Sequence, residues 1–280
     1  MLICNTVNSL HDALNQHKGK SIGFVPTMGA LHEGHMSLIQ NALIDNEIVV
    51  CSVFVNPTQF NNPNDLKVYP RNLESDSFEL EKKGCHILFA PSIEEVYPDS
   101  LDVSNVDVDF GSLTQVMEAH FRPGHFNGVI AVVKRLFEIV QPTRAYFGEK
   151  DFQQLSIVRR LTLNEGFTIE IIGCPIIREA DGLAMSSRNM NLSETERSAA
   201  SLIPTLLQEA ISYYQANGLR NTKTWIENQL QNHPILKLEY FDVANTDTLM
   251  SVERMGTESL RAFIVVYAGA TRLIDNMPVH

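Results

Sequence analysis

Two histidines, His32 and His35, stand where a short apolar run gives way to a helical pattern. The run Ile22 to Val25 predicts a strand, and Pro26 ends it because proline cannot donate to a sheet ladder. Two glycines bracket the histidines, and apolar residues then recur at helical spacing. The N-terminus of a helix offers unpaired N–H groups and the positive end of its dipole. This stretch therefore predicts a site for an anion such as phosphate.

Other interpretations of the histidine pair remain open when the pair is taken alone. The two rings can be a surface pair or part of a purely structural turn. They can also be half of a zinc site, but such a site needs three or four ligands. No Cys-x-x-Cys or compact His/Cys cluster lies nearby in the sequence to supply the others. A zinc site is therefore disfavoured, and a purely structural turn is the default interpretation of this stretch taken alone.

Amide side chains follow a second apolar run. The run Glu47 to Val55 is rich in β-branched residues, which is typical of a strand buried on both faces of a parallel sheet. Asn56 and Gln59 come directly after it, and α/β proteins build binding sites where parallel strands end. We therefore expect these amides to contact a substrate. An ordinary Asn-Pro turn is the alternative for this segment alone.

Cationic and hydroxyl side chains occur in two later segments. Lys150 follows the predicted strand Ala145 to Phe147, and Ser186, Ser187 and Arg188 lie within the polar segment 178–191. Hydroxyls and a guanidinium suit the clamping of phosphate oxygens. A surface ion pair is the alternative for Lys150 and Arg188 taken singly. If parallel strand ends bring these segments to one crevice, they form a triphosphate-binding set.

The order of predicted elements gives the fold class. From about residue 21 to 177 strands and helices alternate, which predicts an α/β protein with a Rossmann-like, doubly wound parallel sheet. No Gly-x-Gly-x-x-Gly follows a strand and no P-loop is present. We expect helices at 5–18, 72–84, 112–121, 152–164, 194–217 and 221–232, and a further apolar helix that follows residues 121–128 and ends near residue 140. We expect strands at 22–25, 47–55, 86–90, 145–147, 168–177, 237–244 and 261–268.

A change of character near residue 176 predicts two domains. Residues 1–176 form the nucleotide- and substrate-binding domain, and residues 177–280 form a smaller α+β domain that acts as a lid. A length of 280 residues is enough for two such domains. Ser193 and Glu196 form a capping box at the start of the first helix of the second domain.

Composition excludes several function classes. A net charge of −11 disfavours a nucleic-acid-binding surface. No apolar run approaches the length of a membrane span, and the N-terminus has no signal pattern. The four cysteines are scattered, and three lie in or beside apolar runs, which indicates buried thiols rather than disulfides. We therefore expect a cytoplasmic protein that binds neither nucleic acid nor membrane.

Four blocks along the chain resemble the signature of one enzyme family. A His-x-Gly-His alone is shared by many nucleotidyltransferases, but four blocks in this order are specific. The sequence resembles the pantoate–β-alanine ligase (pantothenate synthetase) family, within the superfamily that includes class I aminoacyl-tRNA synthetases. The likeness is strong over residues 20–192 and only general beyond them. The blocks are Pro26–His35, Phe54–Phe60, Phe147–Gln154 and Asp181–Asn189.

The resemblance implies an AMP-forming ligase. ATP and (R)-pantoate would give pantoyl adenylate and pyrophosphate, and the amine of β-alanine would then attack the adenylate to give pantothenate and AMP. The implied catalytic residues are His32, His35, Lys150, Ser186, Ser187 and Arg188. Gln59 and Gln154 would bind pantoate, with Asn56 supporting them. The implied ATP contacts are Met28, Gly29, Ala30, Leu31, His32, Glu33, Gly34, His35, Gly148, Glu149, Lys150, Asp151, Ile177, Met185, Ser186, Ser187 and Arg188.

The resemblance also implies Mg²⁺ bridging phosphate oxygens and a homodimer. Asp76 and Asp151 are the carboxylates considered near the metal, and the sequence leaves its protein ligands open. The alternative enzyme is a sister His-x-Gly-His adenylyltransferase of coenzyme biosynthesis, which transfers AMP to a phosphate. The amide-bearing blocks argue against it. A nucleotide sensor of the same fold would bind ATP without turnover, and the intact His32, His35 and Lys150 argue against that.

Overall fold

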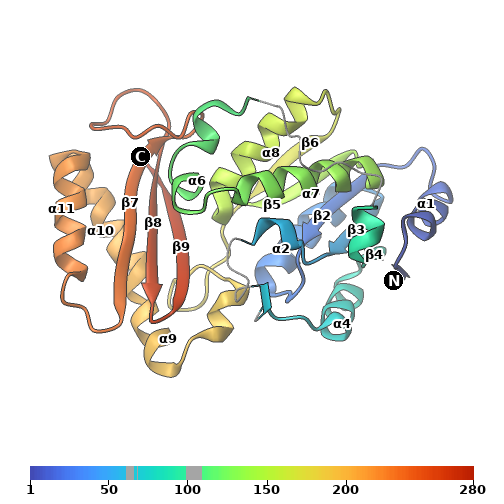
Figure 1. Ribbon diagram of the computed structural model, residues 1–280, viewed down its shortest axis with the longest axis horizontal. Coiled ribbons are helices and arrows are strands. Elements are labelled where there is room, and N and C mark those ends of the chain that lie inside the picture. Colours follow the sequence, from blue (N-terminus) through green and yellow to red (C-terminus); the bar gives the residue numbers. More distant parts are fainter. Residues whose placement is uncertain (61–65, 68, 99–108) are drawn as a thin grey trace.

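A parallel β-sheet forms the centre of the N-terminal part of the molecule. The computed structural model describes residues 1–60, 66–67, 69–98 and 109–280. Within these residues, six parallel strands form a sheet of order β1-β4-β3-β2-β5-β6 (Figure 1). Their bounds are β1 Leu2–Cys4, β2 Ile22–Thr27, β3 Ile48–Val53, β4 Ile87–Phe89, β5 Arg144–Gly148 and β6 Glu170–Cys174.

Helices cover both faces of this sheet. The α-helices of the first part of the chain are α1 Val7–Asn15, α2 Glu33–Asp45, α4 Leu73–Lys83, α5 Ile93–Val96, α6 Glu118–Phe121, α7 His125–Val140 and α8 Phe152–Asn164. Short 3-10 helices lie between them at η1 Pro57–Gln59, η2 Gly111–Thr114, η3 Glu149–Asp151 and, later in the chain, η4 Ser187–Asn191.

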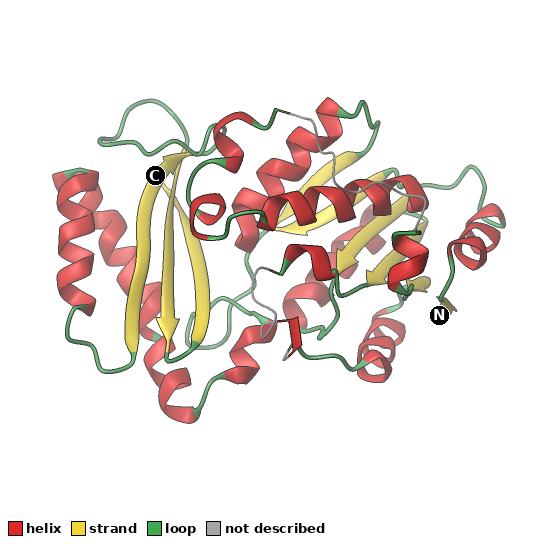
Figure 2. Ribbon diagram, in the orientation of Figure 1, coloured by secondary structure: helices red, strands yellow, loops and turns green. Residues whose placement is uncertain are grey.

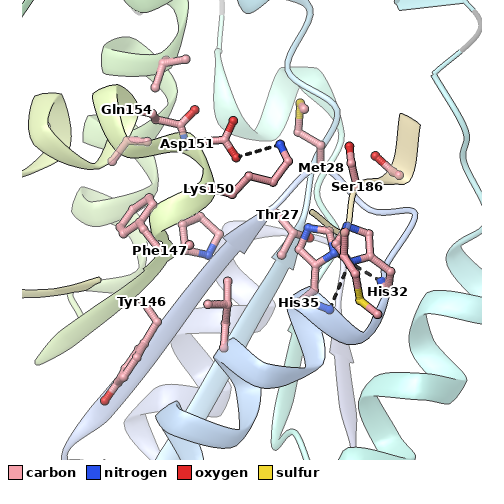
Figure 3. Close-up of a pocket in the computed structure, with 18 of the residues that line it drawn as sticks. Thr27, Met28, His32, His35, Tyr146, Phe147, Lys150, Asp151, Gln154 and Ser186 are labelled. Carbon is pink, nitrogen blue, oxygen red and sulfur yellow. Dashed lines mark hydrogen bonds and ion pairs between the residues drawn. The ribbon is translucent and has the colours of Figure 1, made fainter. Parts of the chain in front are cut away.

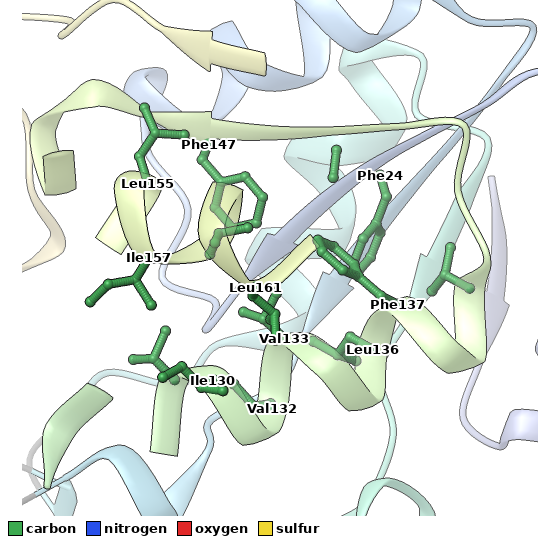
Figure 4. Close-up of a cluster of buried hydrophobic side chains, with 14 of the residues drawn as sticks. Phe24, Ile130, Val132, Val133, Leu136, Phe137, Phe147, Leu155, Ile157 and Leu161 are labelled. Atoms are coloured by element: carbon green, nitrogen blue, oxygen red, sulfur yellow. The ribbon is translucent and has the colours of Figure 1, made fainter. Parts of the chain in front are cut away.

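Alternate residues of one strand pack on opposite faces. Phe24 joins a buried cluster with α7 and α8 and meets Phe137 edge to face, with ring centroids 6.4 Å apart (Figure 4). Its neighbour Val25 packs with residues of α2 and α4, including Ile39 and Leu80, on the other face. This period of two, with helices on both faces, is the doubly wound arrangement. The predicted Rossmann-like sheet is confirmed.

The C-terminal part is a smaller α+β unit. Helices α9 Glu194–Ala200, α10 Leu202–Asn217 and α11 Leu219–Leu230 precede an antiparallel sheet of β7 Leu236–Asn245, β8 Leu260–Ala268 and β9 Thr271–Val279, in which β8 is central (Figure 2). Most of its buried apolar residues form their own cluster. Phe263 of β8, however, packs into the cluster of the first part, against Phe152. The two units therefore share part of their packing.

The helix predicted at 112–121 is wrong as a single element. The structure has η2 and α6 instead, separated by a turn in which Met117 has a φ of 46°. The amide of Gln153 explains the break. Its Nε2 donates to the carbonyl oxygens of Leu113 and Val116, and its Oε1 accepts from the N–H of Glu118. The N–H of Glu118, which a continuous helix would direct to the carbonyl of Thr114, therefore bonds a side chain instead.

The helix predicted at 194–217 is two helices. Helix α9 ends at Ala200 and α10 begins at Leu202. Pro204 has no N–H, and its ring would clash with the carbonyl of the residue four before it, which is Ala200. The capping box predicted at Ser193 and Glu196 is confirmed.

Two strands were not predicted. Strand β1 has three residues at the edge of the parallel sheet, and β9 carries the polar pair Asp275–Asn276 in its middle. Neither pattern indicates a strand by itself. We retain as a proposal the domain boundary at residue 176, which lies between the last strand of the parallel sheet and the first helix of the second unit. Among the described residues, no helix is both long enough and apolar enough to cross a membrane.

Gly128 lets helix α7 cross directly over the Asn56–Gln59 turn. A Cβ at Gly128 would stand 2.5 Å from the carbonyl oxygen of Thr58 and 2.6 Å from the backbone nitrogen of Gln59. We expect Gly128→Ala to lower the free energy of unfolding by about 1–3 kcal/mol, the usual cost of overpacking. Helix propensity alone would favour alanine by about 1 kcal/mol.

The matched control is Asn127→Ala, since Asn127 is exposed on the same helix. Urea titrations of both variants measure the difference. A Gly128→Ala protein as stable as the Asn127→Ala protein would show that the crossing adjusts without cost.

Candidate active site

One pocket lies at the carboxyl ends of β2 and β5, and it gathers all four blocks (Figure 3). The pocket is bounded by the first turn of α2, by η1, by η3 with the start of α8, and by the segment that leads into η4. Of the residues predicted for the site, those that line it are Met28, His32, Gly34, His35, Asn56, Gln59, Gly148, Lys150, Asp151, Gln154, Ile177, Met185, Ser186, Ser187 and Arg188.

The other predicted ATP contacts do not line this pocket. Gly29, Ala30 and Leu31 form the loop behind it, and Glu33 is exposed in the first turn of α2. The carboxylate of Glu149 is paired with Arg261 of β8 at 2.9 Å. The loop and the glutamates therefore support or flank the pocket wall.

The first turn of α2 fixes the orientation of both imidazoles. His32 is the N-cap, and its Nδ1 accepts from the N–H of Gly34 at 3.1 Å. Nδ1 of His35 accepts in turn from the N–H of His32 at 3.3 Å. A neutral imidazole has one donor and one acceptor nitrogen. Because Nδ1 accepts in each ring, the proton of each neutral ring is on Nε2.

Burial keeps both rings neutral. Burial, followed by the charge of Lys150, lowers the pKa of His32 to about 4. Burial, followed by the neighbouring His32 and then Lys150, lowers the pKa of His35 to about 3. The ring centroids are 4.1 Å apart (Figure 3). At neutral pH the pair therefore presents N–H donors rather than two positive charges.

Lys150 supplies a cation on the opposite wall. It lies in η3, between β5 and α8, and its Nζ is 3.6 Å from a carboxylate oxygen of Asp151 (Figure 3). The side chain of Asp151 is half exposed, whereas that of Lys150 is mostly covered. This ion pair leaves the ammonium group at the pocket surface, where it can neutralise an anion.

Asp76 holds the loop behind the histidines. Its two carboxylate oxygens accept from the N–H groups of Ala30 and Leu31, at 3.0 and 2.8 Å. Ala30 has a φ of 52°, in the left-handed region that is unfavourable for a residue with a Cβ. Burial raises the pKa of Asp76, and the two N–H donors partly offset it. The carboxylate therefore acts as a clamp on the loop, a role that no pattern in the sequence indicates.

The predicted amides divide into supporting and ligand-facing groups. Asn56 is buried; its Nδ2 donates to Oε1 of Gln59 and to the carbonyl of Gly128, and its Oδ1 accepts from Tyr97. Nε2 of Gln59 lies 2.9 Å from the sulfur of Met28, which is a weak acceptor. All three amides line the pocket, and Asn56 in addition holds Gln59 in place through its Nδ2.

The segment 178–191 forms a hairpin beside the pocket. Arg178 and Ala184 form an isolated bridge, and the N–H of Met185 donates to the carbonyl of Ile177. Ser186 caps η4 by accepting from the N–H of Arg188 at 3.3 Å. The hairpin thus places both serines and Arg188 along the pocket edge.

Several pocket residues were missed in the sequence. Tyr69 is buried against the hairpin; burial raises its pKa, and a hydrogen bond with Ser187 partly offsets this. The apolar floor consists of one residue that follows β3 and four residues of α7, whose helical spacing is equally typical of a core and so does not mark them as pocket residues. These floor residues are Phe54, Val129, Val132, Val133 and Leu136.

Metal ligands are sparse around the pocket. Among the described residues, no three His, Cys, Asp or Glu side chains are grouped so as to hold a metal ion. Both oxygens of Asp76 already accept backbone hydrogen bonds, whereas Asp151 lines the pocket. Asp151 is therefore the better placed of the two carboxylates considered for the metal.

Comparisons with known proteins agree along the whole chain. A family model described as pantoate-beta-alanine ligase matches residues 2–278. A pantothenate synthetase of Christiangramia forsetii is 51% identical over 264 residues, which cover 94% of this chain and 93% of that protein. The crystal structure of a pantothenate synthetase from Thermus thermophilus has a TM-score of 0.92 at 41% identity and covers 100% of both chains.

A second solved structure contains small molecules. It is a pantoate-beta-alanine ligase from Francisella tularensis complexed with β,γ-ATP and β-alanine, with a TM-score of 0.82 at 36% identity. The match covers 99% of this chain and 97% of that one. Because the family model and these relatives span nearly the full length, the chain belongs to the pantoate–β-alanine ligase family.

Proposed function

We propose that this protein condenses (R)-pantoate with β-alanine to give pantothenate, consuming ATP and releasing AMP and pyrophosphate. The observation that carries the proposal is the meeting of four sequence blocks at one pocket in a chain that belongs to this family. Pantoate first attacks the α-phosphate of ATP, which forms pantoyl adenylate and releases pyrophosphate. The amine of β-alanine then attacks the acyl carbon, and AMP leaves.

The pocket wall supports stabilisation of the adenylation step. Negative charge grows on the phosphate oxygens as pantoate attacks, and preorganised donors lower that barrier. We assign the Nε2–H groups of His32 and His35 as these donors, since both Nδ1 atoms accept from the backbone. Lys150 neutralises the triphosphate, and Ser186 to Arg188 hold the leaving pyrophosphate. This division needs no proton transfer from the imidazoles.

The floor and the amides support pantoate binding. Pantoate carries two methyl groups on a quaternary carbon, and Val129, Val132 and Leu136 give that end of the pocket an apolar surface. An amide both donates and accepts, so Gln59 and Gln154 can bind the hydroxyl and carboxylate groups. We assign both glutamines to pantoate and assign Asn56 to the support of Gln59.

A magnesium ion fits this donor set. Mg²⁺ in nucleotide sites is typically held by one or two carboxylates, substrate phosphates and several waters. Asp151 is a carboxylate at the pocket surface beside Lys150 and would provide the protein ligand. The ion would neutralise phosphate charge when bound. The directional contacts to the phosphates come from the chain's own donors.

We further propose a cytoplasmic homodimer. All four cysteines are buried and free, which suits a reducing compartment. The dimer rests on the family resemblance alone. We also propose that residues 177–280 act as a lid over the nucleotide, because the hairpin at the start of this unit lines the pocket edge.

The test of the function is a product assay with ATP and Mg²⁺, adding pantoate and β-alanine singly and together. We expect AMP and pantothenate only with both substrates, and pyrophosphate limited to about one per site with pantoate alone. A sister adenylyltransferase would incorporate AMP into a phosphate ester acceptor without releasing AMP. ATP binding with no product under any combination would favour a sensor instead.

Replacement of one imidazole tests the donor assignment. We expect His35→Ala to slow pyrophosphate release by about 10²–10³-fold, the usual cost of losing one transition-state donor. Because the pKa values of His32 and His35 are about 4 and 3, the wild-type adenylation rate should stay level between pH 8 and 6. An imidazole that worked as an acid would instead make the rate rise as the pH falls.

The control for His35→Ala is His17→Ala, since His17 lies in the loop after α1, away from the pocket. Circular dichroism checks that both variants fold. Wild-type pyrophosphate release by His35→Ala would remove His35 from the mechanism.

Substitution of a ligand-facing glutamine tests the pantoate pocket. We expect Gln59→Ala to raise the KM for pantoate roughly tenfold, which corresponds to the loss of about one hydrogen bond. The KM for ATP should stay within twofold of the wild-type value. The comparison variant is Gln154→Ala, for which the same selectivity is expected. If either change weakens ATP and spares pantoate, that glutamine belongs to the nucleotide site.

A further inference from the structure

The C-terminal sheet reaches into the wall of the pocket through one side chain. Asn276, in the middle of β9, is only 2% exposed. Its Nδ2 donates to the carbonyl oxygens of Glu149 and Lys150, at 3.0 and 2.8 Å. Both acceptors belong to η3, the turn that carries the pocket lysine. The backbone of this turn is thus tied to a strand more than a hundred residues later in the chain.

The orientation of this amide is determined by its partners. Oδ1 of Asn276 accepts from Nη1 of Arg261, and a guanidinium has no acceptor. The two carbonyl oxygens on the other side of the amide have no proton to donate. Only one orientation of the amide therefore satisfies every partner. Asn276 cannot flip without losing all three hydrogen bonds.

Arg261 strengthens the same connection. It is 9% exposed, its Nη2 lies 2.9 Å from a carboxylate oxygen of Glu149, and its guanidinium carbon lies 4.3 Å above the ring of Phe152. The charged group is therefore held between the turn and the first residue of α8. Strands β8 and β9 together therefore contact the backbone of η3, the carboxylate of Glu149 and the ring of Phe152.

The preceding residue of β9 holds the other side of the pocket. Successive side chains of a strand point to opposite faces, so Asp275 points away from η3. Its two carboxylate oxygens accept from Arg178 at 2.7 and 2.9 Å, and its side chain is 1% exposed. Arg178 also donates to the carbonyl of Gly182 and bridges Ala184. Asp275 thus anchors the base of the hairpin that carries Met185 to Arg188.

We propose that Asp275 and Asn276 are positioning residues that set the Lys150 turn and the Ser186–Arg188 hairpin in register across the triphosphate site. The proposal rests on the proposed function, because the triphosphate is the ligand that both segments serve. Neither residue is part of the lining of the pocket that the four blocks share. Asn276 acts through the carbonyl oxygens of η3, and Asp275 acts through Arg178. The C-terminal sheet is then a part of the active-site scaffold as well as a lid.

The first experiment uses Asn276→Asp, which keeps the size and the acceptor for Arg261 but removes both donors to η3. We expect kcat/KM for ATP in pyrophosphate release to fall about 10–100-fold, the usual cost of a misplaced catalytic group. The KM for pantoate should stay within twofold. In a Lys150→Ala background the same change should lower kcat/KM for ATP less than threefold, because the side chain that Asn276 positions is then absent.

The matched control is Val279→Ala on the same strand, which removes buried apolar contacts far from η3. It separates positioning from general loss of stability. The proposal is overturned if Val279→Ala, at the same unfolding midpoint as Asn276→Asp, loses as much kcat/KM for ATP as Asn276→Asp does. It is also overturned if Asn276→Asp lowers kcat/KM by the same factor in the wild-type and Lys150→Ala backgrounds.

Hydrogen exchange gives a readout that does not depend on the reaction. In the full-length protein without substrates, Asn276→Asp should speed exchange in residues 149–153, whereas Asp275→Asn should speed it in residues 182–189. Exchange that rises equally in both segments in both variants would overturn the division of roles. If wild-type protein makes no pantothenate, the proposed function fails, while the exchange pattern and the affinity for an ATP analogue still test the positioning.

Discussion

Two main-chain N–H groups in the first turn of α2 determine what the pocket can do. By donating to Nδ1 of His32 and His35, they place the proton of each neutral ring on Nε2. Burial then keeps both rings neutral beside Lys150, whose charge opposes a second and third cation at close range. The result is the fixed positive charge of Lys150 beside two neutral donors. Such an arrangement favours an anion, because the neutral rings do not repel the ammonium group of Lys150.

The loop before α2 contains a residue in an unfavourable backbone conformation, and this loop leads into the turn that orients His32 and His35. Ala30 adopts a left-handed conformation that costs on the order of 1 kcal/mol or more for a residue with a Cβ. The buried carboxylate of Asp76 offsets the strain by accepting from Ala30 and Leu31. A residue of α4 therefore supports the start of another helix, α2, which is capped by His32 and carries His35 in its first turn. Each oxygen of this carboxylate accepts one of the two backbone hydrogen bonds.

Sequence reasoning identified most elements and most of the pocket. The blocks at Pro26–His35, Phe54–Phe60, Phe147–Gln154 and Asp181–Asn189 meet at one place because parallel strands end at the same edge of the sheet. The prediction failed where a tertiary contact overrode local pattern. The apolar spacing of 112–121 is helical, yet Gln153 takes the main-chain groups that a continuous helix would use.

Three residues whose supporting roles the sequence did not predict share one physical property. Gln153, Asp76 and Asn276 all use buried side chains to bond main-chain N–H or carbonyl groups of distant segments. Main-chain groups are the same in every residue, so their partners leave no pattern in the sequence. Leaving such a buried group unpaired costs about 1–3 kcal/mol, comparable with the loss of a large apolar contact. The shape of this pocket therefore depends on polar side chains that lie outside its lining, and only the three-dimensional arrangement identifies them.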